Sequence, residues 1–409
     1  MISAERRFSW LNNIWVLLAA GLLAHLWLIQ IGLHGIGTPM GDVPYAYQPW
    51  LLQMINSHKL LGINMDWVYP FPALLPIWTA ALINPMDFQT GWFTLVIIVD
   101  LVALAALANW GRRNEDTAMR FSAAWYWLCF VIALGPVSIS RIDAFSVALA
   151  LFGVLQLAKR KLNSSTAWFS IGAAMKVWPA AILLAIMSAS KYRIRVLVAM
   201  LSTGAILLGL GFLLGGNSSM FSFLNDESER GIQIESPIAS WWIWAGKFRL
   251  ANSGIYYDKH MLTFQVAGDG IPLISSLMTY AMLVAIAITC WLTWRAAKSG
   301  TRFQQLLPIA ALTAVLDLIV FNKVGSPQFV TWLAVPIIIG VLYRTPNWKL
   351  PMISVIAIAL VTDIVYPVVY DYILNAQTWA LAILLLRNLG YIALLIWANR
   401  RLAGEKLSQ

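Results

Sequence analysis

Residues 10–33 read WLNNIWVLLAAGLLAHLWLIQIGL, an apolar stretch without a single Asp, Glu, Lys or Arg. About 20 such residues, wound as a helix, cross the hydrocarbon core of a bilayer. The segment before it is basic, and no small-residue cleavage site follows it, which argues against a cleaved signal peptide. The stretch therefore predicts a first membrane-spanning helix that is retained.

The same pattern recurs along the chain. Hydrophobic residues make up 60% of the sequence and charged residues 11%, whereas soluble domains carry about 25% charged residues. We therefore expect an all-α polytopic membrane protein, a single integral membrane domain over residues 1–409 with about 11–13 transmembrane or re-entrant helices. Further apolar runs cover residues 67–84, 91–110, 119–138, 142–158, 165–190, 195–214, 271–294, 303–321, 327–343, 349–367 and 377–398.

The net charge of +10 does not indicate a nucleic-acid partner. Lys and Arg occur in short clusters between apolar runs, which is typical of cytoplasmic loops. Both cysteines, Cys129 and Cys290, lie inside apolar runs. A disulfide framework and a zinc site are therefore not expected.

The basic clusters predict that both termini are cytoplasmic and that two long hydrophilic stretches, residues 34–66 and 215–270, face outward. If the runs 67–84 and 165–190 each crossed the membrane once, the basic clusters at Arg112 and Lys159 would lie outside the cell. All clusters return inside if 67–84 is re-entrant and 165–190 is a hairpin broken at Lys176–Pro179. We favour this second topology, because non-helical backbone at membrane depth is tolerated where protein or a water cavity surrounds it.

Charged side chains within apolar runs need an explanation, since each costs about 2.5–3.5 kcal/mol near the bilayer centre. Lys176 either snorkels to an interface or faces a polar cavity that receives an anion beside a helix broken at Pro179. Arg141 and Asp143 either pair locally to order a turn or point toward the outer face. Asp100 and Asp317 are expected to be structural hydrogen-bond partners.

The outer stretches contain further candidates. Asp42 and Asp66 could act as a general base and an orienting carboxylate, or simply be solvated acids. Gln233 and Glu235 alternate with isoleucines and could point into one sugar or acceptor site. The tryptophans of residues 241–244 predict an amphipathic interfacial helix or a platform that stacks on sugars.

Between the apolar runs 303–321 and 327–343 and at the start of the second run, Lys323 and Gln328 either belong to a Gly- and Pro-containing turn or line an outward cavity. The sequence contains no Gly-rich nucleotide-binding pattern, zinc signature or hydrolase elbow. A transferred group would therefore have to arrive on a lipid carrier.

Several short motifs, in their order and spacing, resemble glycosyltransferase family 87. They are Asp42 with Tyr45, Trp67-Val68-Tyr69-Pro70, Arg141-Ile142-Asp143, Lys176-Val177-Trp178-Pro179, Arg230-Gly231-Ile232-Gln233-Ile234-Glu235-Ser236 and Ser326-Pro327-Gln328. The resemblance covers most of the chain and implies a GT-C-type fold. It also implies transfer of mannose, or next arabinofuranose, from a polyprenyl-phosphate sugar to a lipid-linked or polysaccharide acceptor outside the cytoplasmic membrane.

The resemblance implies that Asp42, in the first outer loop, is the catalytic base. Many members carry a histidine after the Ser-Pro pair, where this chain has Gln328, Phe329 and Val330. We expect Lys176 and Arg141 to hold the donor phosphate, and neither a cofactor nor a metal is expected. Sugar or acceptor contacts are expected from Tyr45, Asp66, Tyr69, Asp143, Gln233, Glu235, Lys323 and Gln328.

Two other functions suit part of the pattern. Intramembrane charges and broken helices also occur in transporters, and a flippase of a lipid-linked sugar is one alternative. The missing inverted repeat and the loops concentrated on one face argue against it. A non-catalytic scaffold in envelope assembly is the other alternative.

Overall fold

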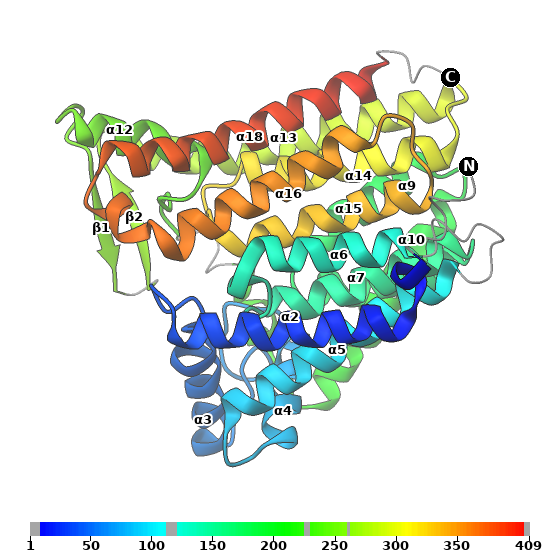
Figure 1. The fold of residues 1–409 in the computed structure, drawn as a ribbon, viewed down its shortest axis with the longest axis horizontal. Coiled ribbons are helices and arrows are strands. Elements are labelled where there is room, and N and C mark those ends of the chain that lie inside the picture. Colours follow the sequence, from blue (N-terminus) through cyan, green and yellow to red (C-terminus); the bar gives the residue numbers. More distant parts are fainter. Residues whose placement is uncertain (1–8, 112–120, 225–229, 260–261, 405–409) are drawn as a thin grey trace.

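A computed structural model describes residues 9–111, 121–224, 230–259 and 262–404. Most of the described chain is helical, and the helices lie side by side with both chain ends at the same end of the bundle (Figure 1). Within the described residues, seven helices are long and apolar enough to cross a membrane. The predicted all-α polytopic membrane fold is thus confirmed.

The elements fall into three groups: the helices that form candidate membrane spans, among which α16 continues through η9 to Val368, then the shorter helices, and then short turns. The long helices are α2 (Ile14–His34), α5 (Phe88–Gly111), α10 (Arg193–Leu213), α13 (Ile271–Lys298), α14 (Phe303–Val320), α16 (Lys349–Asp363) and α18 (Thr378–Ala403). The shorter helices are α3 (Gln48–Ser57), α4 (Leu74–Ile83), α6 (Ser122–Leu134), α7 (Asp143–Ala158), α8 (Leu162–Met175), α9 (Pro179–Ala189), α12 (Ser240–Lys247), α15 (Val330–Leu342) and α17 (Tyr370–Leu374). Short turns are η1 (Ser9–Asn12), η2 (Val43–Tyr47), η3 (Phe71–Ala73), η5 (Gly135–Ser138), η6 (Ser218–Phe221), η7 (Pro237–Ala239), η8 (Pro327–Phe329) and η9 (Ile364–Val368).

Local sequence sets where the first and last long helices begin and end. Asn13 caps α2, and its side-chain oxygen accepts a hydrogen bond of 2.9 Å from the backbone N–H of Trp15. That bond satisfies one of the donors left free at a helix start. At the other extreme, α18 ends at Gly404 in the left-handed conformation, with Arg400 and Arg401 in its last turn. A glycine after the last turn and basic residues within it both favour a helix end.

The centre of the bundle is buried, and its exterior is largely apolar. Thirteen of the 18 residues of α14 and every residue of α15 are buried, whereas no residue in the most apolar window of α13 is buried. Exposed leucines of α13, among them Leu273, Leu277 and Leu283, recur at helical spacing. So large an apolar surface would promote aggregation in water, but it suits contact with lipid chains.

Both of the runs whose topology the sequence left open form short helices. Helix α4 has 10 residues and is therefore about 15 Å long, half of what a bilayer crossing needs. It turns back along α5, where Ala80 contacts Gly91. Helices α8 and α9 form an antiparallel hairpin, because Leu162 at the start of α8 and Ala189 at the end of α9 line the same cavity.

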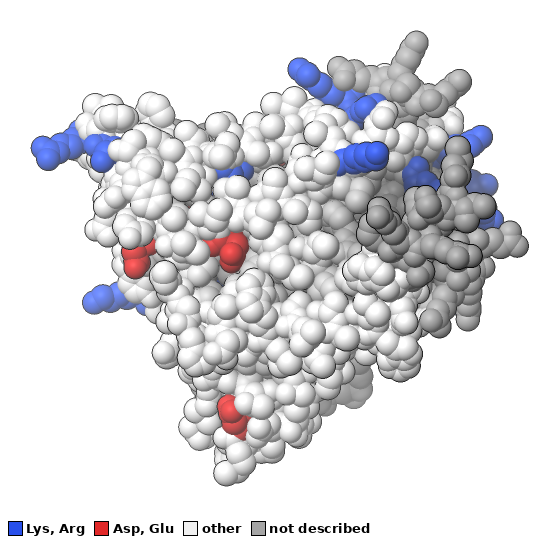
Figure 2. Space-filling model, in the orientation of Figure 1, with Lys and Arg blue, Asp and Glu red and all other residues white. Residues whose placement is uncertain are grey.

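Charged side chains are scarce over the broad middle of the face in Figure 2. The acidic side chains visible on that face all lie in the half away from the chain ends (Figure 2). This distribution is what a membrane belt between two polar ends produces.

The second hydrophilic stretch contains a small sheet that sequence reasoning did not predict. Strands β1 (Gly254–Asp258) and β2 (Thr263–Ala267) pair antiparallel, with Gly254 opposite Ala267. The tryptophan-rich segment does form a helix, α12, which packs on β1 and α18 with Trp242 buried and Trp241 exposed. The hairpin, α12 and α3 all lie at the end of the bundle opposite the chain ends (Figure 1).

Candidate active site

Asp42, in the loop between α2 and η2, forms an ion pair with Arg141, in the turn just before α7. Asp42 precedes η2, in a turn closed by a 2.9 Å hydrogen bond from the Gly41 N–H to the Thr38 carbonyl. Arg141 lies between η5 and α7. The Asp42 side chain keeps 40% of its surface exposed, whereas that of Arg141 keeps 8%. The Asp42 carboxylate is therefore accessible at the protein surface, whereas the Arg141 side chain is buried.

Two hydrogen bonds fasten the Asp42 loop to the segment that carries Arg141. The Ser140 hydroxyl donates to the Pro39 carbonyl at 3.1 Å, and the Ile142 N–H donates to the Tyr47 hydroxyl at 3.2 Å. Tyr47 is buried against Trp92, with ring centroids 4.6 Å apart. These contacts fix both members of the ion pair on rigid neighbours.

A second ion pair lies two residues further along the chain. Lys176 Nζ is 3.3 Å from Asp143 Oδ2 and 4.5 Å from the centre of the Tyr69 ring. Lys176 follows the last residue of α8 in an extended conformation, and Pro179 begins α9. Proline fixes its own φ and lacks the N–H of a helix interior, so it separates the two helices at this point. The helix break thus places the ammonium beside the start of α7.

Aromatic side chains hold Asp143 in place. The Trp332 indole donates a 2.7 Å hydrogen bond to Asp143 Oδ1. Trp332 stacks on Trp178 with centroids 5.8 Å apart and planes 8° apart, and the Trp178 indole in turn donates to Ser146 Oγ at 2.9 Å. Both oxygens of Asp143 therefore have partners, and its side chain is 2% exposed. This carboxylate positions Lys176 and is poorly placed to accept a proton from an incoming molecule.

Arg141 also lies near a third ion pair, which joins Glu235 to Arg387. Besides Asp42, the side chains of Tyr366, Asp143 and Glu235 lie close enough to interact electrostatically with its guanidinium. Glu235 pairs with Arg387 of α18, whose Nη1 donates to Glu235 Oε2 at 2.7 Å and whose Nη2 donates to the Glu235 carbonyl at 2.5 Å. Burial raises the pKa of the Glu235 carboxyl, and the positive charge of Arg387 partly offsets that rise.

The segment around Glu235 is held by backbone contacts. The Ile234 N–H donates to the Phe264 carbonyl of β2 at 3.2 Å, and the Gln233 N–H donates to the Lys323 carbonyl at 3.0 Å. Gly325 permits this approach, since a Cβ there would lie 2.1 Å from the Ser236 backbone nitrogen. Only glycine lets two backbones come so close. The structure thus brings Gln233 and Glu235 together with the loop of Lys323.

The remaining candidate residues lie less centrally. Tyr45 is 74% exposed on η2, and Gln328 is half-buried in η8. Asp66 is exposed, and within the described residues no hydrogen bond or ion pair links it to Asp42. No contact between described residues therefore supports the expectation that Asp42 and Asp66 work as a close pair. Within the described ranges, no three His, Cys, Asp or Glu side chains come together as a metal-binding group.

Sequence reasoning missed three residues that build this site. Arg387 lies in an apolar run and could have been found as an intramembrane charge. Trp332 and Tyr47 look like ordinary apolar or interfacial aromatics, and no sequence signal marks their hydrogen bonds to Asp143 and to the segment of Arg141.

The fold and these charges define a membrane protein with a cluster of acid–cation pairs at one end of its helices. The family model of glycosyltransferase family 87 matches residues 67–316, more than half of the chain. The chain belongs to glycosyltransferase family 87, and it is therefore a membrane glycosyltransferase. Comparison with curated proteins finds no significant match.

The matched region contains Tyr69, Arg141, Asp143, Lys176, Gln233 and Glu235. Asp42, which lies before it, and Lys323 and Gln328, which lie after it, are outside the match. The place of Asp42 in the site therefore rests on its ion pair with Arg141 and on the hydrogen bonds that fix its loop.

Proposed function

We propose that the protein transfers a sugar from a polyprenyl-phosphate donor to a lipid-linked or polysaccharide acceptor at the outer face of the cytoplasmic membrane. Mannose is the favoured sugar and arabinofuranose the next. The observation that carries the proposal is the Asp42–Arg141 pair, which joins an accessible carboxylate to a buried cation at the end opposite the chain ends.

The outward orientation follows from the basic clusters. Lys and Arg clusters near the chain ends and between the helices favour the cytoplasm. The acidic cluster and the two long hydrophilic stretches lie at the other end of the bundle. A lipid-phosphate donor fits such a site because its sugar and phosphate stay at the interface while its chain remains in the bilayer.

The proposed reaction is a displacement at the anomeric carbon. The acceptor hydroxyl oxygen forms the new bond to this carbon while its proton passes to the Asp42 carboxylate. The bond between the anomeric carbon and the phosphate oxygen breaks, and the electron pair leaves with the polyprenyl phosphate. Positioned proton transfer of this kind contributes roughly 10²–10⁴-fold to a rate.

Lys176 and Arg141 have complementary places in this scheme. Each is a cation already paired with a carboxylate, Lys176 with Asp143 and Arg141 with Asp42. A phosphate that approaches between them gains two cations held in advance, and fixed positive charges act more strongly in a site that excludes water. Tyr69, against Lys176, borders the same place.

The test is transfer by the purified protein in lipid, with radiolabelled polyprenyl-phosphate mannose and polyprenyl-phosphate arabinose offered against a crude envelope acceptor. Incorporation of one label that disappears in Asp42→Asn supports the proposal. Retained incorporation in Asp42→Asn would remove Asp42 from the mechanism. Incorporation of neither label by folded wild-type protein would refute this donor class.

A further inference from the structure

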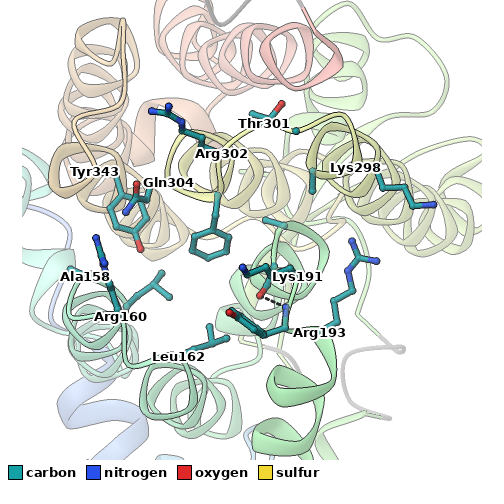
Figure 3. Close-up of a pocket in the computed structure, with 17 residues that line it drawn as sticks. Ala158, Arg160, Leu162, Lys191, Arg193, Lys298, Thr301, Arg302, Gln304 and Tyr343 are labelled. Atoms are coloured by element: carbon teal, nitrogen blue, oxygen red, sulfur yellow. Dashed lines mark hydrogen bonds between the residues drawn. The ribbon is translucent and has the colours of Figure 1, made fainter.

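The end of the bundle that carries the chain ends contains a cavity remote from the proposed active site. Its volume is about 660 Å³, and it is lined where α7, α9, α13 and α15 end and where α8, α10 and α14 begin (Figure 3). Helix α10 alone has 21 residues, so about 30 Å of helix separates this end from the other. We call it the basic cavity.

The basic cavity has one sign of charge. Five of its 17 lining residues are cations, and none is Asp or Glu; the cations are Arg160, Lys191, Arg193, Lys298 and Arg302. Figure 3 shows their side chains spread around the rim of the cavity, and they come from the ends of α7, α9 and α13 and the starts of α10 and α14. Like charges gathered in this way repel one another, so an anion among them relieves repulsion as well as gaining attraction.

Arg193 carries a polar atom without a partner. Its Nε is buried and has no hydrogen-bond partner among the described residues. Its Nη2 makes a long contact of 3.4 Å to the Ser188 carbonyl. A buried donor without an acceptor is uncommon and needs an explanation. A bound anion would supply the missing acceptor.

A groove of apolar character continues from the same arginine. A second hollow of about 200 Å³ lies between α9, α10 and α13, and Arg193 lines both. Its other lining residues are Met187, Ser188, Ile194, Leu197 and Trp294. Ile194 is 71% exposed and Leu197 40% exposed, and the outward faces of α10 and α13 are apolar. The groove therefore opens toward lipid.

We propose that the basic cavity and this groove bind one anionic membrane phospholipid. The headgroup phosphate lies among Arg193, Lys191 and Arg302, and an acyl chain lies along Ile194 and Leu197. Topology alone requires cations at this end, but it requires neither a cavity that collects them nor an apolar groove joined to it. A soluble phosphate compound would use the cavity and leave the groove empty.

Native mass spectrometry of the detergent-purified chain measures this binding. The probes are phosphatidylglycerol, phosphatidylcholine as a neutral lipid, and glycerol 1-phosphate as a soluble phosphate. We expect phosphatidylglycerol to bind more tightly than phosphatidylcholine. Arg302→Gln, at an exposed position, and Arg193→Gln should each weaken the binding of phosphatidylglycerol by about fivefold. That factor corresponds to the contribution of one cation near an anionic lipid surface.

Arg195→Gln is the matched control. Arg195 is in the same first turn of α10, faces the Tyr192 ring at 5.0 Å and does not line either hollow. Its loss should weaken phosphatidylglycerol binding less than the loss of Arg193 or Arg302 does, because Arg195 lines neither hollow. Equal affinity for the two lipids, or an equal loss in Arg195→Gln and Arg302→Gln, would overturn the proposal. Glycerol 1-phosphate binding as tightly as phosphatidylglycerol would overturn it too, because the groove would then contribute nothing.

Discussion

Asp42 forms an ion pair with Arg141, and Asp143, two residues after Arg141, forms a second ion pair with Lys176. The two pairs differ in access, since the Asp42 side chain is 40% exposed and that of Asp143 is 2% exposed. The same residue type thus has two environments at one site. The exposed carboxylate is open to solvent, whereas the buried one is held against Lys176.

Asp42→Asn should fold, bind donor and lose transfer by about 10²–10⁴-fold, because asparagine keeps the shape but cannot take up the proton. Initial rates with radiolabelled donor at saturating concentration measure this. Asp66→Asn is the matched control, an exposed carboxylate on the same stretch without a contact to Asp42. Near-normal transfer by Asp42→Asn together with inactivity of Asp66→Asn would exchange the roles of the two acids.

Removal of Lys176 should weaken donor binding. Lys176→Ala alone would leave Asp143 buried without its cation, which destabilises by about 3–5 kcal/mol. The sharper variant is therefore Lys176→Met with Asp143→Asn, since asparagine keeps an acceptor for the Trp332 indole. Loss of one charge-assisted hydrogen bond predicts about 10–100-fold weaker donor binding.

Asp143→Asn alone is the control for that double variant, because it retains the lysine. Donor affinity measured by isothermal titration should be weaker in the double variant than in the control, which keeps the lysine but loses the carboxylate that orients it. Equal affinity in both would show that Lys176 does not contact the donor. Lys176→Arg is expected to rescue incompletely, because a planar guanidinium differs in geometry from an ammonium.

The topology predicts which positions react with a membrane-impermeant thiol reagent in intact cells. In a background lacking Cys129 and Cys290, cysteine at the exposed Ser57 or Ser218 should be labelled from outside. Cysteine at Ser299, exposed after α13 at the other end, should react only after permeabilisation. Labelling of Ser299 alone in intact cells would invert the proposed orientation.

The Glu235–Arg387 pair should matter for stability and for its pH dependence. Arg387→Met leaves the Glu235 carboxylate buried and uncompensated, a loss of about 3–5 kcal/mol. Burial already raises the pKa of Glu235 above 4.5, and without Arg387 that pKa should rise further. The folded state then binds more protons than the unfolded state, so the free energy of unfolding falls as pH rises from 4.5 through the folded pKa.

Melting temperatures in detergent between pH 4.5 and pH 8 measure this effect. The decline with pH should be steeper in Arg387→Met than in the wild type. The double variant Glu235→Met with Arg387→Met removes both charges and should recover part of the stability at the upper end of the range. A double variant as unstable as Arg387→Met would show that the pair's charges are not the cause.

Gly325→Ala should displace the loop that holds Glu235. The new Cβ would meet the Ser236 nitrogen at 2.1 Å, and relief of such overpacking costs about 1–3 kcal/mol. Gly209→Ala, whose Cβ would meet nothing within 4 Å, should be neutral or slightly stabilising, by up to about 1 kcal/mol. Equal melting temperatures for the two variants would contradict the close approach.

The membrane class, the number of apolar runs and the end at which the chain termini lie were predictable from sequence. Each depends on local composition, and a run of apolar residues must span lipid whatever its neighbours are. The break at Lys176–Pro179 was predictable as well, because proline acts on its own turn. The hairpin of β1 and β2 was not, since five-residue strands give a weak periodic signal.

The site itself was only partly predictable. Arg141, Asp143 and Lys176 stood out because charge in an apolar context is conspicuous, and Asp42 stood out as a carboxylate in the first hydrophilic stretch. Their pairing did not follow from the sequence, which left open a local Arg141–Asp143 pair and a pair of Asp42 with Asp66. Packing joined Arg141 to Asp42 and Asp143 to Lys176 instead.

The sequence by itself determined that this is a helical membrane protein with two long hydrophilic stretches, because hydropathy and charge distribution act residue by residue. Only the tertiary structure decided which carboxylate is accessible and which one positions Lys176. It also decided that Arg387 binds the side chain and the carbonyl of Glu235. Those assignments depend on contacts between segments far apart in the chain, and burial in such contacts makes each buried charge require a specific partner.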